Sequence, residues 1–356
     1  MLLIDSHLDL GMNALLMNRD LTLPVAELRR RETGMPEPGR ALGTVSFPAM
    51  REGEVGLCLG TVIARVKENG GGSARLDYAS PEIAYGVAQG QLAYYRALAA
   101  AGEIRLIADV AGLEAHLADW SQQPTTGKRP IGLILAMEGA DCIVSPAQTE
   151  AWWNDGLRVV SLSHYGEGRY AYGTETEGGV KPLGRELLRE IERLGMILDI
   201  THLADQAFWE ALELFGGPIL ASHNNCRSLV PAQRQFSDEQ IRAIIERDGV
   251  IGVAFDAWML YPGWIRGKTT NETVTMENVA DHIDHICQLA GNARHVALGT
   301  DLDGGYGYEQ TPNDLHTIAD LQKLTGILAR RGYTQQDTEL FAHGNWLRKF
   351  RTAWSR

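Results

Sequence analysis

Histidine and acidic residues recur in this chain directly after short apolar runs, and these residue types bind divalent metal ions. Seven of them follow six such runs: His7 and Asp9, then Glu138, His164, His202, His223 and Asp301. Burying imidazole or carboxylate groups one at a time would remove their hydration without compensation, whereas a shared cation supplies the missing partner. Each residue alone is more simply a hydrogen-bonded histidine, a helix cap or an ion pair. Together they predict a metal site.

The residue types also indicate which metal and how many ions. Imidazole and carboxylate ligands suit Zn²⁺, and two metal ions about 3.5–4 Å apart share a ligand. Glu138 has two oxygens for this bridging role. A carbamylated lysine is the alternative bridge, but none of the six lysines follows a strand-like run. We therefore expect two Zn²⁺ ions per chain with Glu138 between them.

The apolar runs are typical of buried strands, and most of them precede a segment with helical periodicity. We expect nine strands, at residues 2–5, 55–64, 104–108, 131–137, 158–163, 196–201, 218–222, 250–255 and 295–300. This alternation favours an α/β fold of the (β/α)8 TIM-barrel type with parallel strands and long βα loops; an open doubly wound sheet is the alternative. One early run would then be an accessory strand or a barrel edge. In a barrel the seven residues would converge, because all carboxyl ends of the strands face one side.

The helical segments and loops are also readable from the sequence. Helices are expected at residues 81–101, 182–194, 203–215, 237–247, 277–290 and 313–331, and long loops at 66–80, 165–180 and 256–275. Ser237 and Asn313 are the expected caps of two helices. His282 and His285, in a segment that also carries Asp281 and Asp284, are expected on a solvated helix face. No repeat or linker divides the chain, which favours a single metallohydrolase domain over residues 1–356.

Composition argues against several classes of protein. A net charge of −12 and a pI near 5.3 oppose binding to a phosphate backbone. No window reaches the roughly 18 apolar residues of a membrane span. The four cysteines lack CxxC spacing, which is typical of reduced thiols in a cytoplasmic protein. We therefore expect a cytoplasmic protein with neither a nucleic-acid nor a membrane partner.

Several longer motifs resemble those of the renal (membrane) dipeptidase family of the amidohydrolase superfamily. The matching segments run along almost the full chain: IDSHLDL, AMEGAD, the LSH at 162–164, LDITH, ASHNNCRSLVPAQRQ, LGTDLDGG and HGNWLRKF. The resemblance implies that one zinc is held by His7, Asp9 and Glu138, and the second by Glu138, His202 and His223. It further implies that Asp301 is the proton shuttle, that His164 polarises the scissile carbonyl, and that Arg234 binds the terminal carboxylate of the substrate.

These roles are chemically consistent and imply a binuclear zinc dipeptidase. A hydroxide bridging two zinc ions is a competent nucleophile near neutral pH, and a planar guanidinium binds a carboxylate bidentately. The expected substrates are small dipeptides with a free carboxyl end, including L-Xaa-D-Xaa dipeptides. The resemblance also suggests a homodimer. Two alternatives stay open: a metal-dependent amidohydrolase acting on N-acyl amino acids, cyclic amides or lactones, and a barrel that binds a metal or ligand without turnover.

The chain departs from the mammalian members of the family at two places. The loop after His164 lacks the asparagine that those enzymes carry shortly after the equivalent histidine. Asp256 stands where they have a tyrosine after the seventh strand. Neither change touches the expected metal ligands, so both bear on the pockets for the substrate side chains.

Overall fold

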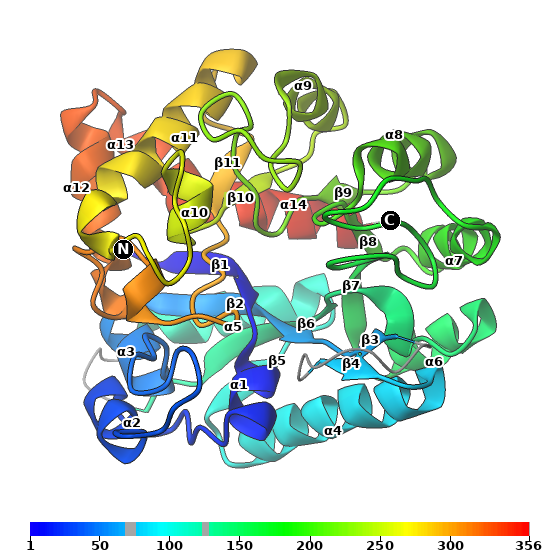
Figure 1. Ribbon diagram of the computed structural model, residues 1–356, viewed down its shortest axis with the longest axis horizontal. Coiled ribbons are helices and arrows are strands. Elements are labelled where there is room, and N and C mark those ends of the chain that lie inside the picture. Colours follow the sequence, from blue (N-terminus) through cyan, green and yellow to red (C-terminus); the bar gives the residue numbers. More distant parts are fainter. Residues whose placement is uncertain (68–75, 123–127, 356) are drawn as a thin grey trace.

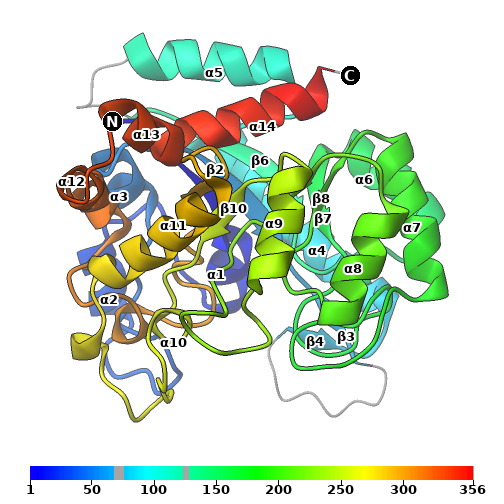
Figure 2. The same ribbon diagram turned by 90° about the horizontal axis from the view of Figure 1, so that it is seen from above.

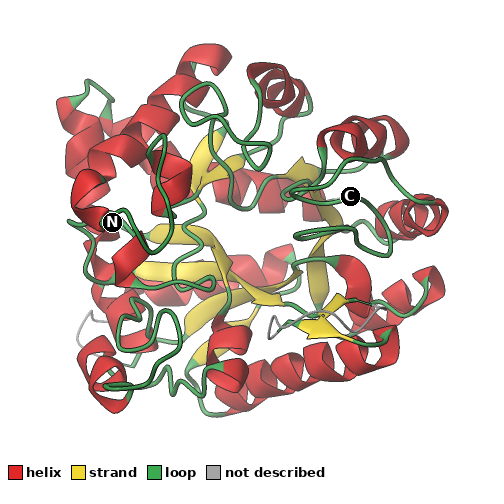
Figure 3. Ribbon diagram, viewed as in Figure 1, coloured by secondary structure: helices red, strands yellow, loops and turns green. Residues whose placement is uncertain are grey.

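The computed structural model describes residues 1–67, 76–122 and 128–355. The glycine-rich part of the expected loop at 66–80 lies outside these residues. Helices surround a ring of parallel strands, as Figure 3 shows. Within the described residues, no helix is both long and apolar enough to cross a membrane.

Eight strands form the ring in chain order (Figure 1). They are β1 (Leu3–Leu8), β2 (Val55–Val62), β6 (Ile131–Met137), β7 (Leu157–Ser161), β8 (Ile197–Asp199), β9 (Ile219–Leu220), β10 (Ile251–Val253) and β11 (Val296–Leu298). The first six pair in parallel within one sheet, and β10 pairs in parallel with β11. The ninth expected strand is β5 (Ile104–Leu106), which pairs with β6 outside this path. The predicted (β/α)8 barrel with one accessory strand is thus confirmed.

The two sheets join through a few specific contacts. A parallel bridge between Ala221 and Ile251 links β9 to β10. The Ser6 hydroxyl donates to the Leu298 carbonyl at 3.0 Å and so links β1 to β11. The strands approach so closely here that a Cβ added at Gly299 would lie 1.8 Å from the Ser222 carbonyl oxygen. A glycine at this position is therefore required for the barrel to close.

Apolar side chains fill the amino-terminal half of the barrel. Ile4, Leu57 and Ile134 belong to one buried cluster that also includes Trp346 and Phe350 of α14 (Asn345–Trp354). In Figure 2, α14 and α5 (Val110–Gln122) lie along one edge of the molecule, and the loop containing α10 (Ala257–Leu260) lies along the opposite edge. One end of the barrel is therefore closed by apolar packing, which leaves the carboxyl ends of the strands for the site.

Five of the six expected helices occur close to their predicted positions. They are α4 (Pro81–Ala100), α7 (Pro182–Arg193), α8 (Asp205–Leu214), α9 (Asp238–Glu246) and α11 (Met276–Ala290). Ser237 caps α9 as expected, in a reciprocal capping box with Gln240. The remaining α-helices are α1 (Leu10–Leu16), α2 (Val25–Arg31), α3 (Phe47–Glu52), α6 (Thr149–Asn154), α12 (Lys323–Arg330) and α13 (Gln335–Glu339).

Two details of the helix prediction were wrong. Residues 313–317 are not helical: a 3-10 turn at Ile318–Gln322 precedes α12, and Thr317 rather than Asn313 forms the capping box. Asn313 instead donates its backbone N–H to the Val274 carbonyl. His282 is 1% exposed rather than solvated, and its Nδ1 accepts the Cys226 backbone N–H. In both places a contact with a distant loop determines the local structure or burial. The periodicity of the neighbouring sequence carries no information about such a contact.

Candidate active site

The seven strand-end residues converge at the open end of the barrel, as the sequence predicted. Glu138 lies at their centre, buried to 5% exposure. Its Oε1 lies within 3.2–3.7 Å of four imidazole Nε2 atoms, those of His202, His223, His7 and His164. A carboxylate in contact with four imidazoles forms a set of donor atoms that could hold a metal ion.

The other acidic residues adjoin the same cluster through His7. The His7 Nε2 lies 3.7 Å from Asp9 Oδ1 and 3.9 Å from Asp301 Oδ1. Three groups of potential ligands result, each with its atoms within 4.8 Å of one another: His7, Glu138 and His223; Glu138, His164 and His202; and His7, Asp9 and Asp301. The groups share His7 and Glu138, so they form one continuous cluster of potential metal ligands.

Hydrogen-bond partners at Nδ1 orient three of the histidines so that Nε2 can bind a metal. Ser222 Oγ lies 2.9 Å from His223 Nδ1 and 3.3 Å from His7 Nδ1, and Thr174 Oγ1 lies 2.9 Å from His202 Nδ1. Partners at Nδ1 orient the rings and leave Nε2 free for a metal, as in other metal sites. The buried His7 Nε2 has no hydrogen-bond partner among the described residues. The donor set therefore fits zinc.

The cluster also carries excess negative charge, which favours a bound cation. Burial lowers the pKa of His202 and His223 well below the usual value, which keeps both imidazoles neutral. Burial acts against protonation of His7 as well, yet the nearby Glu138, Asp9 and Asp301 raise its pKa to about 10. Without a metal ion, the excess negative charge would thus be met by a proton on His7. A divalent cation would take its place.

Asp301 combines backbone strain with a partly open carboxyl group. Its φ is +57°, in the left-handed region that residues other than Gly, Asn and Asp rarely adopt. Gly304 in the next turn has no side chain and so leaves room for this carboxylate. A Cβ added at Gly304 would lie 1.9 Å from Asp301 Oδ1. Burial raises the pKa of Asp301 well above its usual value. A carboxyl group that holds protons readily at the cavity wall suits proton transfer.

His164 is neutral, and one of its tautomers is favoured. Burial lowers its pKa to about 4. Its Nδ1 lies 3.3 Å from Arg65 Nη1, and Arg65 is held by a 2.7 Å ion pair with Asp77. Because a guanidinium can only donate, Nδ1 accepts and the proton resides on Nε2. His164 can therefore donate an Nε2 hydrogen bond to a carbonyl oxygen in the cavity.

Replacing Arg65 by methionine is expected to lower kcat by about tenfold with little change in KM, since the His164 tautomer would no longer be imposed. Arg65→Lys, which keeps a donor, should recover part of the loss. Arg105→Met, which removes the exposed Arg105–Asp119 ion pair, is the matched control. Steady-state kinetics and thermal melting check this. A lower Tm with unchanged kcat would assign Arg65 a structural role only.

Arg234 lies in the same cavity, 5% exposed. Its Nη2 donates to the His223 carbonyl at 2.8 Å, which fixes the guanidinium beside the cluster. Its Nη1 is buried and has no partner among the described residues. An unpaired, buried guanidinium nitrogen is costly unless a ligand satisfies it, and a carboxylate does this best.

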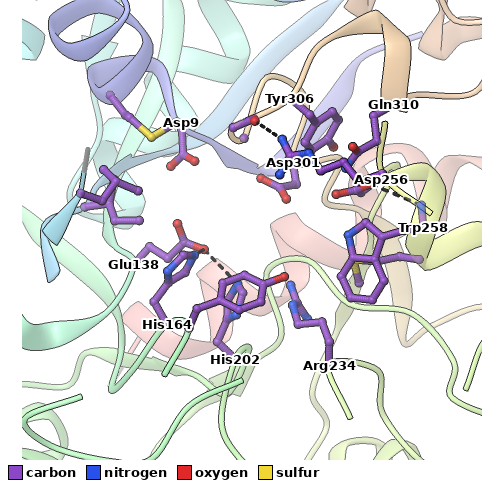
Figure 4. A pocket seen from close by; sticks show the side chains of 18 of the residues that line it. Asp9, Glu138, His164, His202, Arg234, Asp256, Trp258, Asp301, Tyr306 and Gln310 are labelled. Carbon is purple, nitrogen blue, oxygen red and sulfur yellow. Dashed lines mark hydrogen bonds and ion pairs between the residues drawn. The ribbon is translucent and has the colours of Figure 1, made fainter. Parts of the chain in front are cut away.

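The cavity between these groups has a volume of about 430 Å³. Figure 4 shows side chains from opposite walls pointing into it: Asp9, Glu138, His164 and His202 face Asp256, Trp258 and Gln310. It is large enough for a small molecule that spans the metal cluster and Arg234.

Sequence reasoning missed the residues that hold the site in place, namely Arg65, Thr61, Thr174 and Ser222. The Thr61 hydroxyl, for example, donates to Asp9 Oδ1. Only Ser222 carried a local signal, because it adjoins His223. Arg65 and Thr174 come from other loops and strands, where nothing in the neighbouring sequence marks them.

Comparison with known proteins agrees with this site. The family model for membrane dipeptidase (peptidase family M19) matches residues 1–355. A Klebsiella pneumoniae protein of unknown function from the pqqA 5′ region is 28% identical over 277 residues, which cover 75% of this chain and 96% of that protein. An uncharacterised dipeptidase of Schizosaccharomyces pombe is 30% identical over 227 residues, 62% of this chain and 53% of the yeast protein.

Solved structures share the fold over the whole chain. A metallopeptidase described as dipeptidase AC of family M19 superposes with a TM-score of 0.79 at 21% identity, covering 100% of this chain and 99% of its own. A metallopeptidase of Rhodobacter sphaeroides gives 0.77 at 22% identity, covering 99% of both chains. The family match over nearly the full length shows that this chain belongs to the membrane dipeptidase family, peptidase family M19.

Proposed function

We propose that this protein is a binuclear zinc dipeptidase that hydrolyses small dipeptides with a free carboxyl end. The observation that carries the proposal is Arg234 Nη1, which is buried without a partner in the cavity that also contains the metal cluster. A guanidinium held in this way, with one nitrogen left unpaired inside the cavity, is suited to bind a substrate carboxylate. A dipeptide presents a carboxylate and a scissile amide within one small molecule.

The proposed ligands are His7, Asp9 and Glu138 for one zinc ion, and Glu138, His202 and His223 for the other. When bound, the two ions would lower the pKa of a water molecule and polarise the scissile carbonyl. Glu138 contacts both sets of imidazoles and is the proposed bridge. The hydroxyls of Ser222 and Thr174 keep the imidazoles in the orientation that this requires.

The remaining steps use side chains of the cavity. Arg234 holds the substrate carboxylate and so places the amide against the cluster. The His164 Nε2–H donates a hydrogen bond to the carbonyl oxygen, where negative charge develops. Asp301 takes a proton from the attacking water and delivers it to the amide nitrogen as the C–N bond breaks. The products are two amino acids.

An L-Xaa-D-Xaa dipeptide is the first substrate to try. The Rhodobacter sphaeroides metallopeptidase is liganded with a phosphinate mimic of L-Ala-D-Ala, and the two chains share the fold. The test is to load the purified protein with zinc, measure bound metal, and screen L,L, L,D and D,D dipeptides. We expect two zinc ions per chain and hydrolysis of at least one class. Fewer than one zinc per chain with no dipeptide hydrolysed would reject the proposal.

Replacing Arg234 by methionine is expected to raise KM for a dipeptide by roughly a hundredfold, because a charge-assisted hydrogen bond is lost from a buried site. Arg266→Met is the matched control, since Arg266 lines the same cavity but is exposed and donates to the Gly305 carbonyl. Steady-state kinetics on both variants check this. An unchanged KM for Arg234→Met, with hydrolysis of a neutral lactone or cyclic amide, would favour the broader amidohydrolase alternative.

The cytoplasmic location stays a prediction from the sequence, and the homodimer stays a prediction from the family resemblance. Size-exclusion chromatography with light scattering measures the second directly.

A further inference from the structure

Asp256 is a buried carboxylate of the cavity that the proposed reaction does not use. It follows β10 as the cap of α10 and is 6% exposed. Its side chain lines the same 430 Å³ cavity as Arg234 and Asp301. None of the groups of potential metal ligands found in the described residues includes it.

The donors around Asp256 are all neutral. Gln310 Nε2 donates to its Oδ1 at 2.8 Å, and the Trp258 backbone N–H reaches the same oxygen at 3.4 Å. These contacts do not offset burial, which raises the pKa of Asp256 to about 7. The positive charge of Arg266 lowers this pKa only in part; the Arg266 side chain is exposed, and its Nη2 donates to the Gly305 carbonyl. Within the described residues, Asp256 makes no ion pair.

Aromatic side chains share the cavity with this carboxylate. Trp258, Trp264 and Tyr306 line the same cavity, and Figure 4 shows the Trp258 indole beside Asp256. Indole faces attract cations through the ring quadrupole, most strongly where water is excluded. A carboxylate beside an indole therefore favours an ammonium or guanidinium group over a neutral or acidic one.

The position of Asp256 indicates which part of a dipeptide it would meet. In Figure 4, Asp256, Trp258 and Arg234 lie on the side of the cavity away from Asp9 and Glu138. If Arg234 holds the carboxylate of the carboxyl-terminal residue, this wall faces the side chain of the same residue. The amino-terminal residue would lie on the other side of the scissile bond, toward the cluster.

From this arrangement we infer that Asp256 and Trp258 form a specificity subsite for a cationic side chain on the carboxyl-terminal residue of the dipeptide. The inference rests on the proposed dipeptidase function and adds the substrate class. The side chains of lysine, ornithine and arginine each supply the cation that would pair with Asp256. Aliphatic residues of the same length leave Asp256 without a cationic partner, and acidic residues are repelled.

The test compares two dipeptides, Ala-lysine and Ala-norleucine, in the stereochemistry that the zinc-loaded enzyme hydrolyses. They differ only in the ammonium group that ends the lysine side chain. We expect the kcat/KM ratio of lysine to norleucine to be at least about tenfold in the unaltered protein. Asp256→Asn should bring the ratio to within about twofold of one, and Asp256→Glu should keep part of the preference.

Glu175→Gln is the matched control, because Glu175 also lines the cavity but is exposed. This variant should leave the ratio within about twofold of its original value, since solvent screens its charge. A ratio near one in the unaltered protein overturns the inference. So does an Asp256→Asn variant that loses activity equally on both substrates, because a purely structural role would do that.

The two failures are distinguishable. If no dipeptide is hydrolysed, the proposed function fails and the inference with it. If Ala-norleucine and Ala-lysine are hydrolysed equally well, only the inference fails.

Discussion

Replacing Asp301 by asparagine is expected to reduce kcat by about three orders of magnitude while the protein still folds. General acid–base catalysis by a positioned side chain contributes roughly 10²–10⁴ in rate, and asparagine cannot accept the proton of the attacking water. Asparagine is also one of the few residues that tolerates the left-handed backbone at this position, where φ is +57°. The substitution therefore removes the proton acceptor without disturbing the turn.

Steady-state kinetics with the zinc-loaded variant measures this loss, and circular dichroism checks the fold. Asp248→Asn is the matched control, because Asp248 also has a positive φ, +49°, but lies away from the cavity in an ion pair with Arg348. The control should keep its kcat within about twofold. Activity of Asp301→Asn close to that of the unaltered protein would remove Asp301 from the mechanism and revive the alternative of a barrel that binds without turnover.

Replacing Glu138 by glutamine is expected to abolish both activity and stable metal binding. The Glu138 carboxylate contacts four imidazoles within 3.2–3.7 Å. Glutamine has the same shape but no charge and only one acceptor oxygen, so it cannot join two cations. We expect zinc content to fall from two ions per chain to less than one after dialysis, and kcat/KM to fall by more than about a thousandfold.

Metal analysis and a melting curve with and without zinc check this prediction. The unaltered protein should melt at a higher temperature with zinc, because a ligand that binds only the folded state stabilises it. Glu138→Gln should lose that increase. Glu103→Gln is the matched control: Glu103 is buried to 9% exposure in ion pairs with Arg51 and Lys128, and the variant should still bind two zinc ions. Full zinc content in Glu138→Gln would contradict the bridging role.

The pattern of strands and strand-end residues was readable from the sequence, because each signal is local. An apolar run followed by a histidine or an acid is visible within ten residues, and parallel strands of a barrel bring all such ends to one side. His7, Glu138 and His223 are therefore found together although they come from β1 and from the segments that follow β6 and β9. The barrel and the family were predictable for the same reason.

What holds these side chains in place was decided only by the tertiary structure. Ser222 is next to His223 in the chain, yet its hydroxyl also lies 3.3 Å from His7 Nδ1, 215 residues away. Arg65 and His164 meet across 99 residues. The burial of Asp256 beside Gln310 depends on loops after β10 and β11 meeting over the cavity. Such contacts leave no local signal in the sequence, because they depend on which loops the closed barrel brings together. The strand-end ligands do leave one, because each directly follows an apolar run in the chain.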